Sequence, residues 1–340
     1  MLQSFLIKPY TVEFSQSAKI PVPEKGEVLI KLKMVGICGS DIHMYKNGHR
    51  VDGPLTIGHE GIGIIEKTGE GISPERIGKR VAIEPNIPCL HCPECWKGRG
   101  NVCRDKRIIG VNEHGCFAEY ICLPDEFAHT LPDSIAETDA VAIEPATVAL
   151  AALNRSKAKP GDTIAVIGLG AIGMLLTHIA LSLGYCVLVT ELAEQKIRKA
   201  IKMGARFVKN GNSLEETAEI YESAFLKDEV VTVFECAGSE ESAALAIKST
   251  PRGVDVILLG LSEEGATFNP RLISRKGNHI VPSLIYDHPY DFKRCIRLIE
   301  NGIISPGFIV SKFYPLNQLS EALTEAQKGS ESKIVIRIPE

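Results

Sequence analysis

The sequence lacks any long uninterrupted apolar run. Its longest hydrophobic stretches, such as residues 165–176, are short and interrupted by glycine, whereas a membrane-spanning helix needs about 20 consecutive apolar residues. The first residues also lack the basic segment and the small-residue cleavage site of a secretory signal. We therefore expect a cytoplasmic protein with no membrane partner.

Basic stripes, arginine-rich runs, internal repeats and low-complexity segments are also missing. The formal net charge is −4, so we expect no nucleic acid as the main partner. Of the 340 residues, 44% are hydrophobic and 24% are charged, which is ordinary for a globular protein. A chain of this length favours two domains.

Cysteine, by contrast, is plentiful, with ten residues. In a chain of this length without a secretory signal, metal binding is favoured over disulfides. Four cysteines lie close together in the sequence: Cys89, Cys92, Cys95 and Cys103. This spacing predicts a closed tetrahedral zinc site that stiffens a loop rich in proline and glycine. An iron–sulfur cluster also takes four thiolates, but it is the less favoured alternative because the neighbouring motifs give it no task.

The chain divides by pattern into three segments. Residues 1–150 read as short alternating strands separated by glycine and proline, which predicts an antiparallel β-domain with functional loops. In residues 151–286 strands and helices alternate, which predicts βαβ units and a parallel sheet with helices on both faces. We expect residues 287–340 to return to the first domain.

A glycine fingerprint occupies the start of the second segment. Gly168, Gly170 and Gly173 follow an apolar strand over residues 163–167 and open a helix over residues 171–183. The first glycine permits a tight turn, the second lets the backbone approach a pyrophosphate, and the third lets helix and strand pack closely. The helix N-terminus then offers free N–H groups to the phosphates. This context predicts a dinucleotide site.

The acid at the end of the next strand, Glu191, predicts which dinucleotide binds. A carboxylate there binds the ribose hydroxyls of NAD and repels the 2′-phosphate of NADP. The alternative is a solvated acid at a strand end. Lys196 either softens the preference for NAD or is a surface lysine. We also assign three further residues to the cofactor site: Ile172, Leu261 and Ser283.

Two short motifs near the N-terminus offer a mixed set of metal ligands. Residues 38–43 read Cys-Gly-Ser-Asp-Ile-His, and residues 58–60 read Gly-His-Glu. Cys38, His59 and Glu60 thus supply a thiolate, an imidazole and a carboxylate, the kind of set that binds a catalytic Zn²⁺ and leaves one position open. Alone, Cys38 or His59 would read as a core residue. Glu144 adds a carboxylate within an apolar stretch, where it needs a cation or a strong hydrogen-bond partner.

These motifs, the four-cysteine lobe and the glycine fingerprint occur in one order along nearly the whole chain. In that order they resemble the zinc-dependent medium-chain alcohol dehydrogenases. The Cys-Gly-Ser-Asp-x-His form and a glutamate at position 144 are most similar to the polyol branch, which includes sorbitol dehydrogenases. The resemblance implies an α/β fold, with a GroES-like β-domain and a Rossmann domain whose parallel sheet is doubly wound.

The resemblance also implies a role for each ligand candidate. Cys38 and His59 would be fixed ligands of the catalytic zinc, and Glu60 and Glu144 would be ligands that exchange with each other or with water. Asp41 would hold the His59 ring through its second nitrogen. Which carboxylate is bound at rest stays open.

Two further residues complete the implied mechanism. Ser40 would hydrogen-bond the substrate hydroxyl, and His43 would pass its proton to solvent. Zinc would lower the pKa of the hydroxyl, and hydride would pass to the nicotinamide of NAD. The implied reaction transfers hydride between a secondary alcohol and NAD.

The sequence predicts a class of substrates and not a single compound. Sorbitol enzymes commonly carry Phe-Arg-Tyr where residues 281–284 here read Val-Pro-Ser-Leu, so the arginine that helps to bind a polyol is missing. A polyol, sugar alcohol, cyclitol or sugar acid fits. The alternatives are an amino-alcohol dehydrogenase of the L-threonine 3-type and a non-catalytic NAD-binding protein. Relatives form dimers or tetramers, and Pro282 predicts an edge or irregular strand, where we expect a subunit contact.

Overall fold

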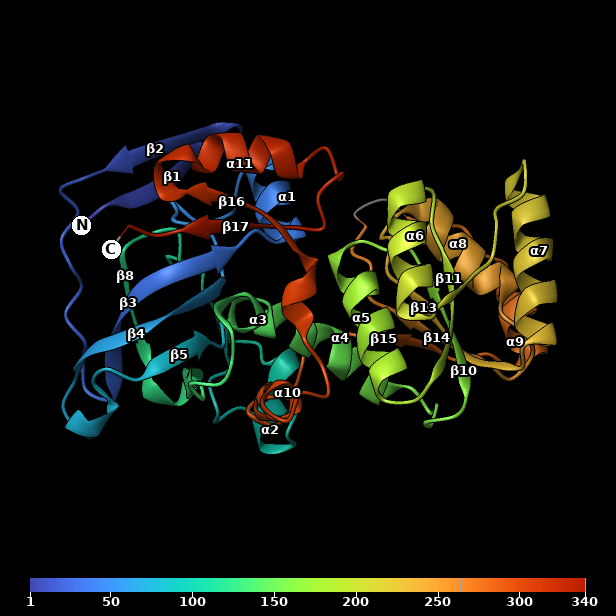
Figure 1. Ribbon diagram of the computed structural model, residues 1–340, viewed down its shortest axis with the longest axis horizontal. Coiled ribbons are helices and arrows are strands. Elements are labelled where there is room, and N and C mark those ends of the chain that lie inside the picture. Colours follow the sequence, from blue (N-terminus) through green and yellow to red (C-terminus); the bar gives the residue numbers. More distant parts are fainter. Residues whose placement is uncertain (263–264, 340) are drawn as a thin grey trace. The chain divides into compact units, whose positions relative to one another are not determined.

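The structure, a computed structural model, describes residues 1–262 and 265–339. The chain folds into two compact units, shown in Figure 1. The first unit combines Met1–Glu144 with Asp287–Glu340, and the second is Pro145–Tyr286.

The first unit is built around a seven-stranded sheet. Its centre is the antiparallel pair of β3 (Glu27–Gly36) and β4 (Glu60–Thr68), the two longest strands of the described chain. Period-two alternation puts Val28, Ile30 and Leu32 into the core. The other strands of the sheet are β5 (Arg80–Ile83), β8 (Tyr120–Pro124), β9 (Ala128–Thr130), β16 (Val310–Pro315) and β17 (Lys333–Arg337).

The returning C-terminal segment completes this unit. Strand β17 pairs antiparallel with the end of β3, and parallel with β16. Leu319 and Ile336 are fully buried in the same hydrophobic core as Ile30 and Phe117. The unit also contains β1 (Gln3–Lys8), β2 (Thr11–Ser15), β6 (Asn86–Ile87), β7 (Arg107–Ile108), α1 (Gly39–Asn47), α2 (Pro93–Trp96), α3 (Glu137–Val141), α10 (Tyr290–Glu300) and α11 (Leu319–Ala326).

The second unit is a parallel sheet of six strands in the order β12-β11-β10-β13-β14-β15. In chain order the strands are β10 (Thr163–Ile167), β11 (Cys186–Thr190), β12 (Arg206–Phe207), β13 (Val230–Glu235), β14 (Asp255–Leu258) and β15 (Ile280–Pro282). The order reverses at β10, which is the topology of a doubly wound fold. Strand β15 lies at the sheet edge, as Pro282 predicts.

Helices lie on both faces of this sheet (Figure 1). They are α5 (Ala171–Ser182), α6 (Glu194–Met203), α7 (Leu214–Lys227), α8 (Glu240–Ser249) and α9 (Pro270–Lys276), with α4 (Ile143–Arg155) leading into the unit. Because both faces are covered, consecutive residues of β10 such as Ile164, Ala165 and Val166 are all fully buried. Helix α6 ends at Gly204, whose φ of 106° only glycine adopts readily.

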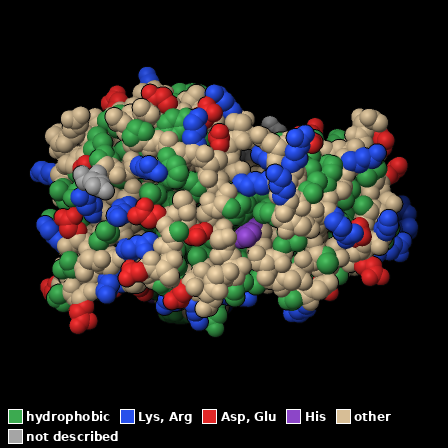
Figure 2. Space-filling view, in the orientation of Figure 1, with side chains coloured by type: hydrophobic (Ala, Val, Ile, Leu, Met, Phe, Trp, Pro, Cys, Tyr) green, Lys and Arg blue, Asp and Glu red, His purple; other side chains and the backbone are tan. Residues whose placement is uncertain are grey.

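Among the described residues, no helix has the length and apolar character needed to cross a bilayer. On the face shown in Figure 2, acidic and basic side chains are interspersed with apolar ones.

A buried carboxylate joins the returning segment to the rest of the first unit. Two histidine rings contact the same oxygen of Glu84. His129 Nε2 lies 2.6 Å from Glu84 Oε2, and His288 Nδ1 lies 2.8 Å from it. These are hydrogen-bond distances, shorter than the roughly 3.3 Å between two donors on one tetrahedral zinc. Phe127 stacks on His288 and Phe292 on His129. Glu84 therefore acts as a hydrogen-bonded junction rather than as a metal ligand.

This junction predicts a pH-dependent contribution to stability. Burial raises the pKa of Glu84, but hydrogen bonds from His129 and His288 outweigh burial and lower that pKa. A lowered folded-state pKa stabilises the fold above the unfolded value, and this stability is lost as the pH falls through the folded-state pKa. Glu84→Gln should therefore lose about 2–3 kcal/mol at pH 7. Urea unfolding measures it.

The difference between wild type and Glu84→Gln should narrow as the pH falls below 4.5, the usual value for this carboxyl group. The exposed Glu75→Gln serves as the matched control and should change stability little at either pH. An equal loss for Glu84→Gln at pH 7 and pH 4 would contradict the charge-based account.

Candidate active site

The pairing of β3 with β4 brings the two metal-ligand motifs together. Gly36 at the end of β3 lies opposite Glu60 at the start of β4, so the chain segments that carry Cys38 and His59 meet at this end of the sheet. Ligand atoms of Cys38, His59 and Glu60 all lie within 4.8 Å of one another. His59 and Glu60 are buried, whereas Cys38 is partly accessible. Three protein donors are the number that a catalytic zinc uses when it keeps a fourth position open.

Asp41 holds these motifs in place. Cys38 precedes α1, and its backbone N–H donates to Asp41 Oδ2 over 2.8 Å, which closes the first turn of the helix. The N–H of Gly58 donates to Asp41 Oδ1 over 3.1 Å. His59 Nδ1 lies 3.5 Å from the same oxygen. One fully buried carboxylate thus contacts both ligand-bearing segments.

The ring of His59 fits a cation. Its Nδ1 is buried without a hydrogen-bond partner, and a small tightening of the 3.5 Å contact would let it donate to Asp41. Burial lowers the pKa of His59, but the charges of Asp41 and Cys38 outweigh burial and raise that pKa well above its usual value. The same negative surroundings attract a metal cation. Thiolate, imidazole and carboxylate are a donor set for catalytic zinc.

A lysine that the sequence analysis missed lies against this site. Lys333, the first residue of β17, is 4% exposed. Its Nζ donates to both oxygens of Glu60, over 2.7 and 2.8 Å, and to the carbonyl of Ile37 over 3.0 Å. Burial lowers the pKa of Lys333, but Glu60, Cys38 and Glu144 outweigh burial and raise it. Lys333 is therefore a charged group inside the site.

The remaining candidates lie on two helices. Ser40 is in the first turn of α1 and is half-buried, while His43, one turn later, is exposed, with Nδ1 3.2 Å from Asn47 Nδ2. Glu144 is the second residue of α4 and is 7% exposed. Its charge contributes to the raised pKa of Lys333, so it lies in the same electrostatic neighbourhood.

The four-cysteine lobe has the spacing of a closed metal site. The Sγ–Sγ distances are 3.9 Å for Cys89–Cys95, 3.5 Å for Cys92–Cys95 and 3.9 Å for Cys92–Cys103. Four sulfurs at about 2.3 Å from one tetrahedral zinc lie about 3.8 Å apart. A backbone hydrogen bond from Cys95 lowers the pKa of Cys92 to about 6, whereas burial raises the pKa of Cys95 to about 12. Metal binding must therefore displace protons.

In the second unit, the glycine fingerprint forms a tight loop after β10. Gly168 has a φ of 90°, and a Cβ there would meet Ala237 at 2.6 Å. A Cβ on Gly173 would lie 2.0 Å from the carbonyl oxygen of Gly168, so the loop closes only with glycine at these positions. Gly170 precedes α5 and has open space around it, which leaves the helix N-terminus accessible to a phosphate.

Glu191 is joined to that loop. Its Oε2 accepts from the N–H of Leu169 over 2.8 Å, and its Oε1 accepts from the N–H groups of Leu192 and Ala193. Glu191 therefore lies beside the glycine loop, and its carboxylate already has three donors. The other cofactor candidates are scattered along the unit: Ile172 in α5, Lys196 in α6, the 87% exposed Leu261 after β14, and Ser283 after β15. The Ser283 hydroxyl is buried without a hydrogen-bond partner.

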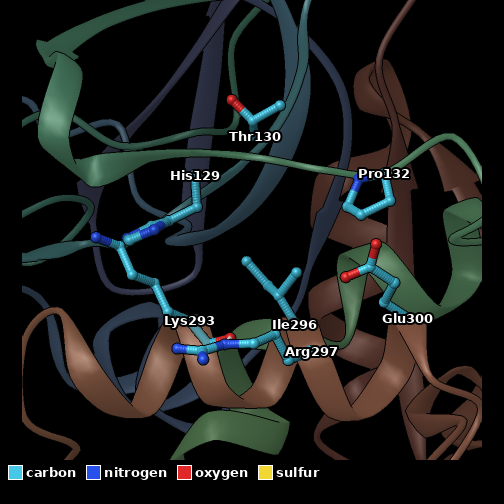
Figure 3. Close-up of a pocket in the computed structure, with 7 residues that line it drawn as sticks. All are labelled: His129, Thr130, Pro132, Lys293, Ile296, Arg297 and Glu300. Carbon is cyan, nitrogen blue, oxygen red and sulfur yellow. Dashed lines mark hydrogen bonds between the residues drawn. The ribbon is translucent and has the colours of Figure 1, made fainter.

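A pocket of about 280 Å³ lies elsewhere on the first unit. Figure 3 shows Lys293 reaching from α10 toward His129 and Ile296 pointing into the pocket, while Arg297 lies along the helix. Its lining contains none of the residues assigned to zinc or to the cofactor, so this pocket is separate from the candidate metal centre.

Comparisons with known proteins match both units. The family model for the alcohol dehydrogenase GroES-like domain matches residues 24–133, and that for zinc-binding dehydrogenases matches residues 171–301. Sorbitol dehydrogenase of Bacillus subtilis (strain 168) is 33% identical over 90% of this chain and 89% of its own. The chain belongs to the polyol branch of the zinc-dependent medium-chain dehydrogenases. The predicted family and fold class are thereby confirmed.

Other members of this dehydrogenase family match over similar lengths. L-arabinitol 4-dehydrogenase of Hypocrea jecorina is 32% identical over 92% of this chain and 85% of its own. The NADH complex of an alcohol dehydrogenase (rspB) from E. coli CFT073 superposes with a TM-score of 0.90 over 99% of both chains, at 28% identity. The zinc and NAD expected from the sequence are the cofactors of this family.

The four-cysteine lobe yields a prediction about metal content. Cys103→Ser removes one of four thiolates and should reduce bound zinc from about two atoms per chain to about one. The lobe should also become more sensitive to proteolysis because its loop then lacks the metal that stiffens it. Elemental analysis and limited proteolysis measure the two effects.

Cys186→Ser is the matched control, because Cys186 is exposed and lies in the second unit. Its zinc content should equal that of the wild type. Unchanged zinc together with unchanged protease sensitivity in Cys103→Ser would contradict a zinc site that depends on all four thiolates.

Proposed function

We propose that this dehydrogenase transfers hydride between a secondary alcohol and NAD, with zinc as the metal of the active site. The observation that carries the proposal is the group of Cys38, His59 and Glu60 held by the buried carboxylate of Asp41. We assign alcohol oxidation to the first unit and cofactor binding to the second. The proposed assembly is a homodimer or homotetramer with β15 at a subunit contact, and the proposed location is the cytoplasm.

Each residue of the metal group has a proposed task. Cys38 and His59 would hold the zinc permanently, and Glu60 or Glu144 would supply a carboxylate that gives way to substrate. Bound there, zinc would act as a Lewis acid on the substrate oxygen. Asp41 would fix the orientation of the His59 ring and increase its basicity as a ligand.

The proton of the alcohol leaves through α1 in this proposal. The half-buried hydroxyl of Ser40 would accept the substrate proton, and the exposed His43 would release it to solvent. Ser40 and His43 are three residues apart on α1, so their side chains are neighbours on the helix surface. The proton would pass from the half-buried residue to the exposed one. NAD, when bound, accepts the hydride.

The substrate class rests on relatives and on one departure from them. The relatives named above act on sorbitol and L-arabinitol, which favours a polyol, sugar alcohol, cyclitol or sugar acid. Residues 281–284 lack the arginine of the sorbitol enzymes, which argues against sorbitol itself. The second candidate is an amino-alcohol dehydrogenase of the L-threonine 3-type. A non-catalytic NAD-binding protein is disfavoured because every ligand and relay residue is present.

A substrate panel tests the proposed reaction. Purified protein is assayed for NAD reduction with polyols, sugar alcohols, cyclitols, sugar acids and L-threonine, and we expect activity with a polyol or sugar-acid member. Cys38→Ser should lower kcat at least about 100-fold, because the metal loses its thiolate ligand, while circular dichroism stays unchanged. Activity with L-threonine alone would favour the second candidate, and NAD binding without turnover would favour the non-catalytic one.

Cofactor choice gives a separate prediction. Glu191→Ala should raise KM for NAD about tenfold or more, because hydrogen bonds to a carboxylate are worth about 1.5–3 kcal/mol. The variant should also have a smaller preference for NAD over NADP, because the carboxylate that repels the 2′-phosphate of NADP is removed. Steady-state kinetics with both cofactors measure this.

Glu194→Ala is the matched control, because Glu194 is an exposed acid three residues away in the first turn of α6. It should leave both KM values unchanged. A Glu191→Ala variant that retains a strict preference for NAD over NADP would contradict this explanation of cofactor choice.

A further inference from the structure

Lys333 makes three hydrogen bonds that join the two ligand-bearing segments. Its ammonium has three donors, and its three acceptors are the two oxygens of Glu60 and the carbonyl of Ile37. Ile37 directly precedes Cys38, and Glu60 directly follows His59. One buried cation therefore fixes the chain on both sides of the metal group.

The Glu60 carboxylate is held against the end of β3 and against Lys333. A Cβ on Gly36 would lie 2.0 Å from Glu60 Oε2, so the carboxylate fills the space that glycine leaves at the end of β3. An oxygen of the same carboxylate belongs to the group within 4.8 Å of Cys38 and His59. Two cations, the ammonium and a bound metal, thus compete for one anionic group.

In this competition the lysine weakens the bond between Glu60 and the metal. A carboxylate paired with an ammonium donates less charge to a metal than an unpaired one, and the ammonium offsets a negative charge beside the site. Without Lys333, a buried Glu60 would lack its ammonium partner and would bind the metal more firmly. An incoming ligand would then displace Glu60 less readily.

We propose that Lys333 is a positioning residue that keeps Glu60 a displaceable ligand, so that a substrate hydroxyl can take its place on the metal. The inference rests on the metal site of the proposed function and adds the residue that controls exchange at that site. It assigns Glu60, rather than Glu144, as the carboxylate that moves. Lys333 contacts neither substrate nor cofactor in this role and acts through Glu60 alone.

Ligand exchange is measured directly on the cobalt-substituted protein. In the exchange reaction 2-mercaptoethanol loses its proton to buffer, its thiolate binds cobalt, and the Glu60 carboxylate leaves the metal. The sulfur-to-cobalt absorption reports binding. Lys333→Met should weaken the thiol affinity about tenfold or more, and Lys333→Arg should restore most of it because the positive charge returns. Equal affinity in Lys333→Met and wild type would overturn the proposal.

The matched control is Lys312→Met on the adjacent strand β16, where the lysine is partly exposed and lies 3.7 Å from Glu325. It should leave the thiol affinity unchanged. If Lys333→Met does not fold, Lys333→Gln carries the same test, with a neutral amide in place of the ammonium. Wild-type affinity in that variant would likewise overturn the proposal.

A double variant tests whether Lys333 acts through Glu60. In the Glu60→Gln background the competing carboxylate is gone, so adding Lys333→Met should change the thiol affinity by less than about twofold. The same large loss in both backgrounds would show that Lys333 acts by another route and would overturn the proposal. The titration uses neither polyol nor NAD, so its outcome is independent of whether the proposed substrate class is correct.

Discussion

The antiparallel pairing of β3 with β4 is the constraint on which the candidate active site depends. It places Gly36 opposite Glu60 and so brings together the segments that carry Cys38 and His59. Strand pairing alone leaves the loops after β3 and before β4 undefined. The buried carboxylate of Asp41 defines them, because it must find donors and takes them from the backbone at Cys38 and at Gly58. The segments that carry the candidate ligands Cys38 and His59 are thus positioned by backbone hydrogen bonds to one carboxylate.

Charged side chains of both signs lie together at the candidate metal site. Asp41, Glu60 and Glu144 are buried acidic residues, and Lys333 is a buried cation whose Nζ donates to Glu60. The raised pKa of His59 reflects the same excess of negative charge. A divalent metal would neutralise that excess, and Lys333 would keep one carboxylate from being bound too firmly. This arrangement supports the proposed exchange of one carboxylate ligand on the metal.

Local patterns predicted much of this molecule. The alternation of strands such as β3 and the glycine fingerprint before α5 can be recognised in the sequence because each depends on neighbouring residues. The family match confirms the fold class and the family that those patterns favoured.

Lys333 and the Glu84 junction were missed, because each joins residues far apart in the sequence. The sequence motif at residues 38–43 predicted ligands but no secondary structure, and the structure puts most of these residues in the first turns of α1. Glu191 was expected at the ribose, and its bonds to Leu169, Leu192 and Ala193 add a second task, which is to hold the glycine loop.

Zinc K-edge X-ray absorption on the intact protein tests the central claim most directly, because it counts sulfur ligands. One zinc on four thiolates and one on Cys38 with nitrogen and oxygen donors would give an average of about 2.5 sulfur ligands per zinc. A nitrogen or oxygen shell at about 2.0–2.1 Å should accompany the sulfur shell. A pure four-sulfur environment would contradict the account, because it would mean that the group of Cys38, His59 and Glu60 holds no zinc.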